Sequence, residues 1–205
     1  MLKRKTEPKT PNTGASAELS VRNRLIEAAS RLFCRYGINA VGVDAVIAEA
    51  GTAKASLYKN FGSKEGLVEA VLVHEGQAWR EWFLGALLEG AAPAREKLHR
   101  IFPLLRDWFT DERFYGCPFI NAVGEHDKDD ARLRELTIAH KMAVLASITA
   151  LAAEAGLPSP EKVAHQLGLL IDGAIIAAMV TRDPGAADLG ASMSRLLLGE
   201  PAAVH

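Results

Sequence analysis

Helical spacing of apolar residues is the first strong pattern in the chain, and it begins at Leu25. From there to Tyr36, apolar side chains recur at intervals of three and four, whereas Arg24, Glu27 and Arg31 lie off that face. This spacing predicts an amphipathic helix. We expect Gly37 to end it, because glycine readily adopts the left-handed conformation that closes many helices. The expected buried face consists of Leu25, Ala28, Ala29, Leu32, Phe33 and Tyr36.

Two shorter apolar patterns follow, and each stops at a glycine. The first begins at Val43 and stops at Gly51, and the second has Leu57 and Phe61 as an inward pair four residues apart. Segments this short are unstable alone, and about three residues separate them, which is typical of a helix-turn-helix unit. We expect Ser63 to cap the helix that comes next.

The remainder of the chain also has the patterns of helices. The helix that follows Ser63 is expected to reach Leu88 with apolar residues on two sides, which indicates burial between partners. Gly and Pro positions separate further helices, and no alternation typical of strands is present. The further helices are expected at residues 94–109, 130–155, 160–181 and 186–198. The sequence therefore predicts an all-α fold, with a three-helix N-terminal unit followed by a helical domain.

The charge of the chain is divided between its two parts. Residues 1–65 hold 11 Lys and Arg against 6 Asp and Glu, whereas residues 66–205 hold 13 against 19. A basic N-terminal part on an acidic body is typical of a nucleic-acid-binding module, although a basic arm kept for solubility would produce part of the same pattern. We expect residues 1–20 to be a flexible basic arm.

Several classes of protein are disfavoured by composition. The longest apolar run, Leu167 to Val180, is cut at Asp172 and is shorter than a membrane span requires. The first twenty residues lack the apolar segment of an export signal, so we expect a cytoplasmic protein. Two cysteines, Cys34 and Cys117, are too few for a disulfide framework.

The third short helix presents a surface suited to DNA. If Leu57 and Phe61 face inward, then Lys54, Ala55, Tyr58 and Lys59 face solvent. In a helix-turn-helix unit the second helix lies in the major groove, where lysine ammonium groups and a phenol can contact phosphates. A simple packing role for Tyr58 is the alternative.

The stretch from Leu25 to Leu67 resembles the DNA-binding domain of TetR-family transcriptional regulators. The resemblance rests on Ala-Ala and Leu-Phe in the first helix, Gly37, Ala50-Gly51, Leu57-Tyr58-x-x-Phe61 and Ser63-Lys64-Glu65. The sequence departs from the family pattern at Gly42 and Ala53, where the family often has residues with a hydroxyl group that caps a helix or contacts a phosphate. We expect Thr52 to supply a hydroxyl in their place. The resemblance implies a DNA-binding domain at residues 21–66 and an effector-binding and dimerisation domain at residues 67–205. It implies DNA contacts by Arg22, Thr52, Ala53, Lys54, Ala55, Ser56, Tyr58, Lys59 and Lys64.

In such regulators the body encloses a pocket for a small molecule. Nine of the thirteen aromatic residues lie between Trp79 and Phe119, which either fill the core or line that pocket. Under the pocket interpretation we expect an apolar or aromatic effector. The expected ligand-binding residues are Trp79, Trp82, Phe83, Phe102, Trp108, Cys117, Phe119, Asn121, His140, Asp172 and Ile176.

Cys117 lies in the motif Gly116-Cys117-Pro118, which is similar to a Gly-Cys segment of one group of TetR-like regulators. Pro118 suits the first position of a helix, which would leave Cys117 at the cap, where the helix dipole can lower the pKa of a thiol. One hypothesis is that Cys117 senses an oxidant or electrophile. The alternative, which we favour, is a small buried residue at a tight corner.

Other polar residues of the body have simpler interpretations. The run from His126 to Asp130 is expected to be a solvated loop in which Asp129 or Asp130 caps the next helix, so we predict no metal site. Asp172 in an apolar helix must be paired, bind a ligand or lie at an interface. The apolar faces of the last two helices, with their Gly and Ala residues, suit the four-helix dimer interface that the resemblance implies.

These observations favour a homodimeric, ligand-responsive transcriptional regulator without a cofactor, more specifically a repressor. Its expected partners are a palindromic double-stranded operator and a small-molecule effector, and we expect it not to be an enzyme. One rival function is an all-helical thiol enzyme that uses Cys117 with His126 or His140, although no base lies at a defined spacing from that thiol. A second rival is a structural DNA-binding protein with a solid body and no effector.

Overall fold

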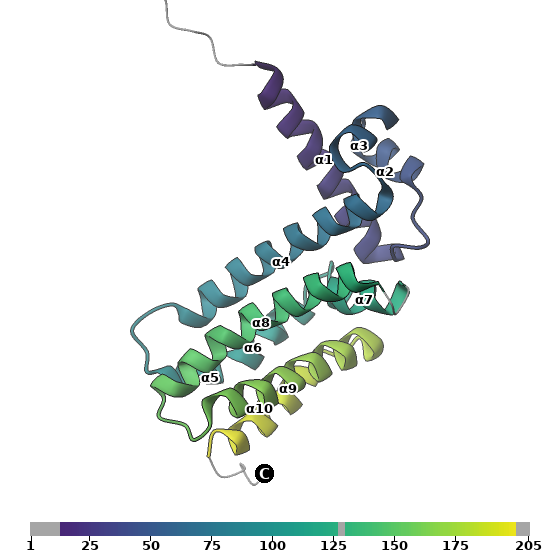
Figure 1. Ribbon diagram of the computed structural model, residues 1–205. Coiled ribbons are helices and arrows are strands. Elements are labelled where there is room, and N and C mark those ends of the chain that lie inside the picture. Colours follow the sequence, from purple (N-terminus) through teal and green to yellow (C-terminus); the bar gives the residue numbers. More distant parts are fainter. Residues whose placement is uncertain (1–12, 127–129, 200–205) are drawn as a thin grey trace, which may run out of the picture.

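The computed structural model describes residues 13–126 and 130–199, and these residues form helices joined by turns and short loops (Figure 1). No strand is present within these two ranges, which confirms the all-α prediction. The three helices of the N-terminal unit are α1 (Thr13–Tyr36), α2 (Val43–Ala50) and α3 (Lys54–Phe61). The body consists of α4 (Lys64–Leu88), α5 (Ala94–His99), α6 (Ile101–Phe109), α7 (Pro118–Glu125), α8 (Ala131–Glu154), α9 (Pro160–Thr181) and α10 (Ala186–Leu197).

The boundaries of the N-terminal helices lie at the residues predicted to end or cap them. α1 ends before Gly37, whose φ is 87°, and Gly51 closes α2 in the left-handed conformation with φ 60°. Ser63 caps α4, because its Oγ accepts a hydrogen bond from the Gly66 amide at 3.1 Å. Leu25, Val46 and Leu57 are buried and contribute to a shared core. Tyr36, at the end of α1, was expected on the buried face, but it is 55% exposed and does not take part in that core.

Two predicted segments differ from the structure. α1 begins at Thr13, inside the predicted arm, since Pro11 is the last proline before a run of residues with fair helix propensity. Residues 1–12 lie outside the described residues. The helix expected at 94–109 divides at Arg100 into α5 and α6. Pro103 accounts for the division, because it has no N–H to donate to the carbonyl of His99.

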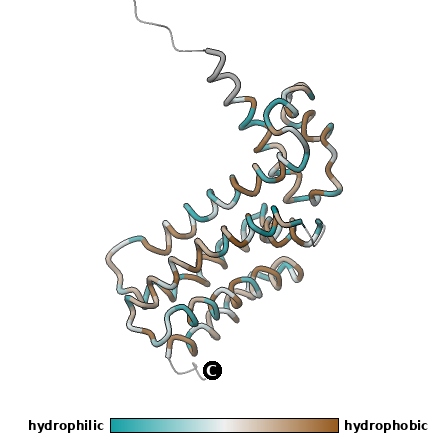
Figure 2. The backbone as a smooth tube through the Cα atoms, in the orientation of Figure 1, coloured by the Kyte–Doolittle hydropathy of each residue, from teal (hydrophilic) through white to brown (hydrophobic). Residues whose placement is uncertain are grey.

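The helices of the body form a bundle in which α4, α8 and α9 run alongside one another (Figure 1). α8 packs on α4 and α9, and α10 covers α9 and α6. Apolar stretches recur along α8 and α9 in Figure 2, as expected for helices that build a core. The largest fully buried side chains of the bundle include Phe83, Phe102, Leu105, Ile148 and Leu167.

By length and composition alone, α8 and α9 are each apolar enough to cross a membrane, which differs from the expectation that the run in α9 stops short. Such a pattern is also typical of core helices in soluble bundles. Within this structure the two helices pack on each other, and Asp172 of α9 forms an ion pair with Lys141 of α8. Asp172 is therefore paired, one of the three outcomes expected for it.

The N-terminal unit contacts the body through more than α4. In the loop after α1, Asn39 donates its backbone N–H to Glu125 Oε2 at 2.9 Å and its side-chain amide to the Glu125 carbonyl at 2.7 Å. Glu125 is the last residue of α7. The N-terminal unit is therefore joined to the body both by the continuous helix α4 and by this non-covalent contact with α7.

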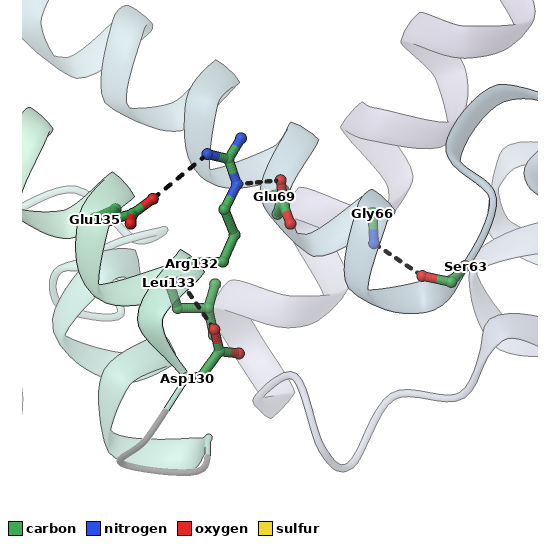
Figure 3. A network of polar contacts seen from close by, with 7 residues as sticks. All are labelled: Ser63, Gly66, Glu69, Asp130, Arg132, Leu133 and Glu135. Carbon is green, nitrogen blue, oxygen red and sulfur yellow. Dashed lines mark hydrogen bonds and ion pairs between the residues drawn. The ribbon is translucent and has the colours of Figure 1, made fainter.

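The second turn of α4 and the first turn of α8 are also joined (Figure 3). Arg132 of α8 donates through Nε to Glu69 Oε2 of α4 at 3.0 Å, and its Nη1 lies 3.8 Å from Glu135. Asp130 caps α8 by accepting the Leu133 amide at 3.1 Å, as one of the two predicted capping alternatives. The rest of the proposed loop, residues 127–129, lies outside the described residues.

Candidate nucleic-acid interface and effector cavity

α2 and α3 form a helix-turn-helix unit, and no side chain caps the N-terminus of the second helix, α3. Gly42 and Ala53 occupy the N-cap positions of α2 and α3 with extended backbones, and neither helix has a side-chain cap. The Ser56 amide donates to the Ala53 carbonyl at 2.9 Å, whereas the amides of Lys54 and Ala55 before it are left to an external acceptor such as a phosphate. Thr52 does not replace the missing cap, because its Oγ1 is buried and has no partner among the described residues.

The outer face of α3 carries most of the residues predicted to contact DNA. Leu57 is fully buried, whereas its neighbour Tyr58 is 45% exposed, so the phenol projects away from the core. Lys54, Ala55 and Lys59 are exposed on the same short helix. A rigid phenol and two ammonium groups on one face form a surface suited to phosphates.

The other predicted DNA contacts border this face. Arg22 of α1 lies over the ring of Phe61 with its guanidinium carbon 5.2 Å from the ring centroid. Lys64 is the first residue of α4, and Ala53 precedes α3 with its side chain exposed. Ser56 is half-buried, and its carbonyl accepts a hydrogen bond from Asn60 at 2.8 Å. The structure thus brings these positions to one end of the molecule, around α3.

One lysine of this surface has a partner within the chain. Lys54 Nζ donates a hydrogen bond to Asp44 Oδ1 of α2 at 2.9 Å, and this contact raises the pKa of Lys54. Both side chains are largely exposed, so the ion pair is weak in water. Lys54 can therefore exchange Asp44 for a phosphate at small cost.

In the body, Trp79 and His140 line two separate cavities, both of which are partly open to the surface. The larger cavity has a volume of about 260 Å³ and lies between α8 and α9, with walls that include Val144, Leu145 and Ile148. The smaller one, about 100 Å³, lies beside α7 and the segment before it. Its walls include Trp108, Cys117 and Phe119. Of the predicted ligand-binding residues, the structure thus places Trp79, Trp108, Cys117, Phe119, His140 and Asp172 at cavity walls.

Trp79 is the centre of a cluster of rings. It stacks on Phe83 with centroids 4.5 Å apart and meets the edges of Trp82 and Trp108 at 6.3 and 5.7 Å. His140 approaches Trp79 from α8 at 5.7 Å and stacks on Phe119 of α7 at 4.2 Å. The rings therefore join α4, α6, α7 and α8 at the wall between the two cavities.

His140 is held in its neutral form. Burial lowers its pKa to about 4, and the positive charges of Arg80 and Lys141 add to this effect. Arg80 Nη1 lies 2.8 Å from His140 Nδ1. Because a guanidinium can only donate, Nδ1 is the acceptor and the ring proton lies on Nε2.

Five predicted ligand-binding residues lie away from these two cavities. Phe83 and Phe102 are fully buried core residues, and Phe102 fills the space beside Gly190, where an added Cβ would lie 2.3 Å from its ring. Trp82 and Ile176 are 40% and 43% exposed on the outer faces of α4 and α9. Asn121 lines a separate space of about 20 Å³ and donates to the Tyr115 carbonyl at 3.1 Å.

The aliphatic wall of the larger cavity was not predicted from the sequence. Lys141, Val144, Leu145 and Ile148 follow one face of α8, and a matching face of α9 contributes His165, Gly168, Leu169 and Asp172. Apart from Asp172, these positions are not among the predicted ligand-binding residues, most of which are aromatic. The available signal was helical spacing in two helices joined by a short connection, which makes antiparallel neighbours.

Neither cysteine has the environment of a reactive thiol. Cys117 is the N-cap of α7 with Pro118 at the first turn, as predicted, but burial raises the pKa of its thiol despite the nearby amides of Ile120 and Phe119. The expected lowering by the helix is therefore outweighed by desolvation. Burial, with a smaller effect of Glu75, raises the pKa of Cys34 to about 12. These environments support the interpretation of Cys117 as a small buried residue.

An exposed apolar surface covers α9 and α10. Leu169 and Val180 of α9 are 74% and 72% exposed, and Leu189 of α10 is 71% exposed. Gly173 and Ala177 lie among them on α9 and are also exposed. Large exposed apolar surfaces of this kind indicate contact with another protein surface. We name it the C-terminal apolar face, and it consists of Leu169, Ile176, Val180, Leu189, Met193 and Leu196.

Comparison with known proteins gives a consistent result. Residues 25–71 match the sequence model of the bacterial regulatory proteins of the tetR family. The HTH-type transcriptional repressor KstR2 of Mycolicibacterium smegmatis is 34% identical over 98 residues, which span 46% of this chain and 44% of that repressor.

Solved structures extend the similarity to the body. SCO4454, a TetR-family transcriptional regulator from Streptomyces coelicolor, superposes with a TM-score of 0.80 at 28% identity, over 88% of this chain and 95% of that one. A putative TetR transcriptional regulator from Streptomyces avermitilis gives 0.77 at 28% identity, over 90% and 99%.

Proposed function

The N-terminal domain of this chain belongs to the TetR family of bacterial regulatory proteins, and from that premise we propose that the chain is a repressor that binds a palindromic operator as a homodimer. A small molecule bound in the body releases it from DNA. The observation that carries the proposal is the joining of an exposed basic helix, α3, to a body with a cavity at Trp79 of α4. We place this activity in the cytoplasm, where the DNA lies.

The surface of α3 supports the DNA-binding part of the proposal. Tyr58, Lys54 and Lys59 project from a helix whose opposite side is fixed by buried Leu57. The backbone N–H groups at the start of α3 are additional hydrogen-bond donors. They lie at the N-terminal end of the helix, which enters the major groove in helix-turn-helix proteins. Phosphate contacts would orient the helix, and base edges within reach of its first residues would select the sequence.

The C-terminal apolar face supports dimerisation. It combines large apolar side chains with Gly173 and Ala177, which permit close approach of a second helix. Two copies of α9 and α10 would then form a four-helix interface related by a two-fold axis. Such a dimer presents two copies of α3 to half-sites about 34 to 36 Å apart.

Two connections would carry the effect of a ligand to α3. Trp79 at the cavity and Lys64 beside α3 lie on the same helix, α4, about 22 Å apart along its axis at 1.5 Å per residue. Phe119, which lines the smaller cavity, lies on α7, whose last residue Glu125 bonds Asn39 of the N-terminal unit. A ligand that displaces either helix would change the spacing of the two DNA-binding units.

The rival functions have less support. A structural DNA-binding protein has no use for a cavity of about 260 Å³ in its body. A thiol enzyme requires a thiolate near neutral pH, whereas burial raises the pKa of the Cys117 thiol. We therefore propose no catalytic role for this residue.

Mobility-shift titration with DNA from the protein's own promoter region tests the proposal. We expect a discrete complex whose affinity falls steeply as salt rises from 50 to 200 mM, because phosphate contacts release counterions. The double variant Tyr58→Ala with Lys64→Ala should bind at least about tenfold more weakly, since each lost contact removes about 1 kcal/mol.

Tyr36→Ala with Lys162→Ala is the matched control, because both side chains are exposed away from α3. It should bind as the wild type does. Equal binding by all three proteins, or binding indifferent to DNA sequence, would contradict the proposal.

A further inference from the structure

The larger cavity has an open side along α9 in a single copy of the chain. His165 and Leu169 line the cavity, yet both side chains are exposed, that of Leu169 by 74%. Pockets for small molecules bury most of the surface of their ligand. A ligand held by one copy alone would remain in water where it meets these two residues, so the described residues leave part of the wall unbuilt.

The residues at this open side belong to the same stripe of α9 as the C-terminal apolar face. The stripe follows one side of the helix, because its members succeed one another at intervals of three and four. All of its members are exposed. The stripe consists of His165, Leu169, Gly173, Ile176 and Val180. It begins at the cavity and continues into the C-terminal apolar face, and Leu169 belongs to both.

α10 brings the C-terminal apolar face to the level of the same opening. It follows α9 after a short connection and packs against it, so the two helices are antiparallel neighbours (Figure 1). The 12 residues of α10 span about 18 Å at 1.5 Å per residue. The same length of α9, counted back from Thr181, reaches Leu169. Leu196, near the end of α10, therefore lies close to the level of Leu169.

We infer that the second subunit of the dimer closes the larger cavity, so that a bound effector contacts both subunits. The inference rests on the proposed function, because it requires a dimer formed through the C-terminal apolar face. A partner that covers Leu169 also covers His165, which lies one turn away on the same stripe. Its surface completes the wall that Val144 and Ile148 form within one subunit.

Closure by the partner links ligand binding to assembly. A ligand that contacts two subunits binds the dimer more tightly than the monomer, and by linkage it lowers the dissociation constant of the dimer. Such a ligand also acts directly on the angle between the subunits. That angle sets the separation of the two copies of α3, so the effector has a route to the DNA-binding units besides α4 and α7.

Alkylation of an introduced cysteine by N-ethylmaleimide tests whether the partner covers the opening. His165→Cys places a thiol at the cavity, one turn outside the residues that define the C-terminal apolar face. As a dimer, this variant should react at least about tenfold more slowly than the same variant made monomeric by Val180→Glu, because the reagent must wait for the interface to open. The native thiols Cys34 and Cys117 contribute little, since burial raises the pKa of both.

Val73→Cys is the matched control, because Val73 is 53% exposed on α4 and lines neither of the two cavities. It should react equally fast with and without Val180→Glu. Leu169→Cys, in contrast, reports the part of α9 that the proposed dimer already covers, and it should be protected in the dimer.

Dilution of His165→Cys gives a second measurement that needs no further substitution. Its alkylation rate should rise as the protein concentration falls below the dissociation constant of the dimer, whereas the rate of Val73→Cys should stay constant.

Sedimentation equilibrium on the same samples distinguishes failure of this inference from failure of the proposed function. If the protein is a dimer in which Leu169→Cys is protected while His165→Cys reacts as fast as in the monomer, only the closure of the cavity is overturned. A wild-type monomer, or a dimer that survives Val180→Glu, would overturn the proposed dimer and the inference with it.

Discussion

At the scale of single residues, burial favours the neutral forms of several titratable side chains in the body. His140 is the clearest case, because its pKa is lowered to about 4 by burial and by Arg80 and Lys141. It stacks on Phe119 and accepts from Arg80 as a neutral ring. Protonation would place a third positive charge beside the first two and remove the acceptor of Arg80.

This residue predicts a pH dependence of stability. The folded pKa lies below the unfolded value of about 6.5, so the unfolded chain binds more protons between about pH 6.5 and 4. The contribution to stability is fully present above pH 6.5 and is lost as the pH falls toward 4, by about 2 kcal/mol after allowance for partial exposure.

His140→Gln is the matched variant, since its amide oxygen can accept from Arg80 and does not titrate. Urea unfolding across this pH range should show the wild type losing about 2 kcal/mol more than the variant. Parallel losses in the two proteins would show that His140 is not the group responsible.

At the scale of elements, the junction between α3 and α4 depends on a close approach. Gly62 turns the chain with φ 75°, and Gly66 of α4 then lies beneath the Phe61 carbonyl. A Cβ at residue 66 would lie 2.1 Å from that oxygen, and a backbone atom cannot move aside without moving the helix. The position of the DNA-facing helix relative to α4 is therefore fixed by the absence of one methyl group.

Gly66→Ala should lower the free energy of unfolding by roughly 1 to 3 kcal/mol, the usual cost of overpacking. Gly85→Ala is the control on the same helix, because nothing lies within 4 Å of its added Cβ. This second change should stabilise the protein by about 0.5 to 1 kcal/mol, since alanine favours the helix. Thermal and denaturant unfolding of both variants measure these effects, and equal behaviour of the two would be inconsistent with the packing described.

The elements also show what the sequence could and could not predict. Helix boundaries at Gly37, Gly51 and Ser63 followed from local chemistry, which one chain segment carries by itself. The division at Arg100 was missed, although Pro103 carried the signal. The aliphatic wall at Leu145 could not be located, because it depends on how α8 and α9 pack in space.

At the scale of the whole molecule, the C-terminal apolar face predicts the assembly state. Val180 is a 72% exposed residue of this face, so a carboxylate there would be buried without a partner in the proposed dimer. Val180→Glu should therefore dissociate the dimer, raising its dissociation constant by at least about a hundredfold, a difference of about 2.7 kcal/mol.

Val73→Glu is the matched control, because Val73 is 53% exposed on α4, away from that face. Sedimentation equilibrium should show a dimer for the wild type and this control and a monomer for Val180→Glu. A wild-type monomer, or an intact dimer in Val180→Glu, would place the interface elsewhere.

Hydroxyl-radical footprinting of the wild type on its promoter tests the central claim most directly, because it reports DNA binding and symmetry together. The account predicts two protected stretches on one face of the duplex, related by two-fold symmetry and centred about 34 to 36 Å apart. Val180→Glu should lose this paired protection at the same protein concentration. A single unsymmetrical protected stretch, or no protection at any promoter position, would contradict a dimeric regulator that reads DNA with two copies of α3.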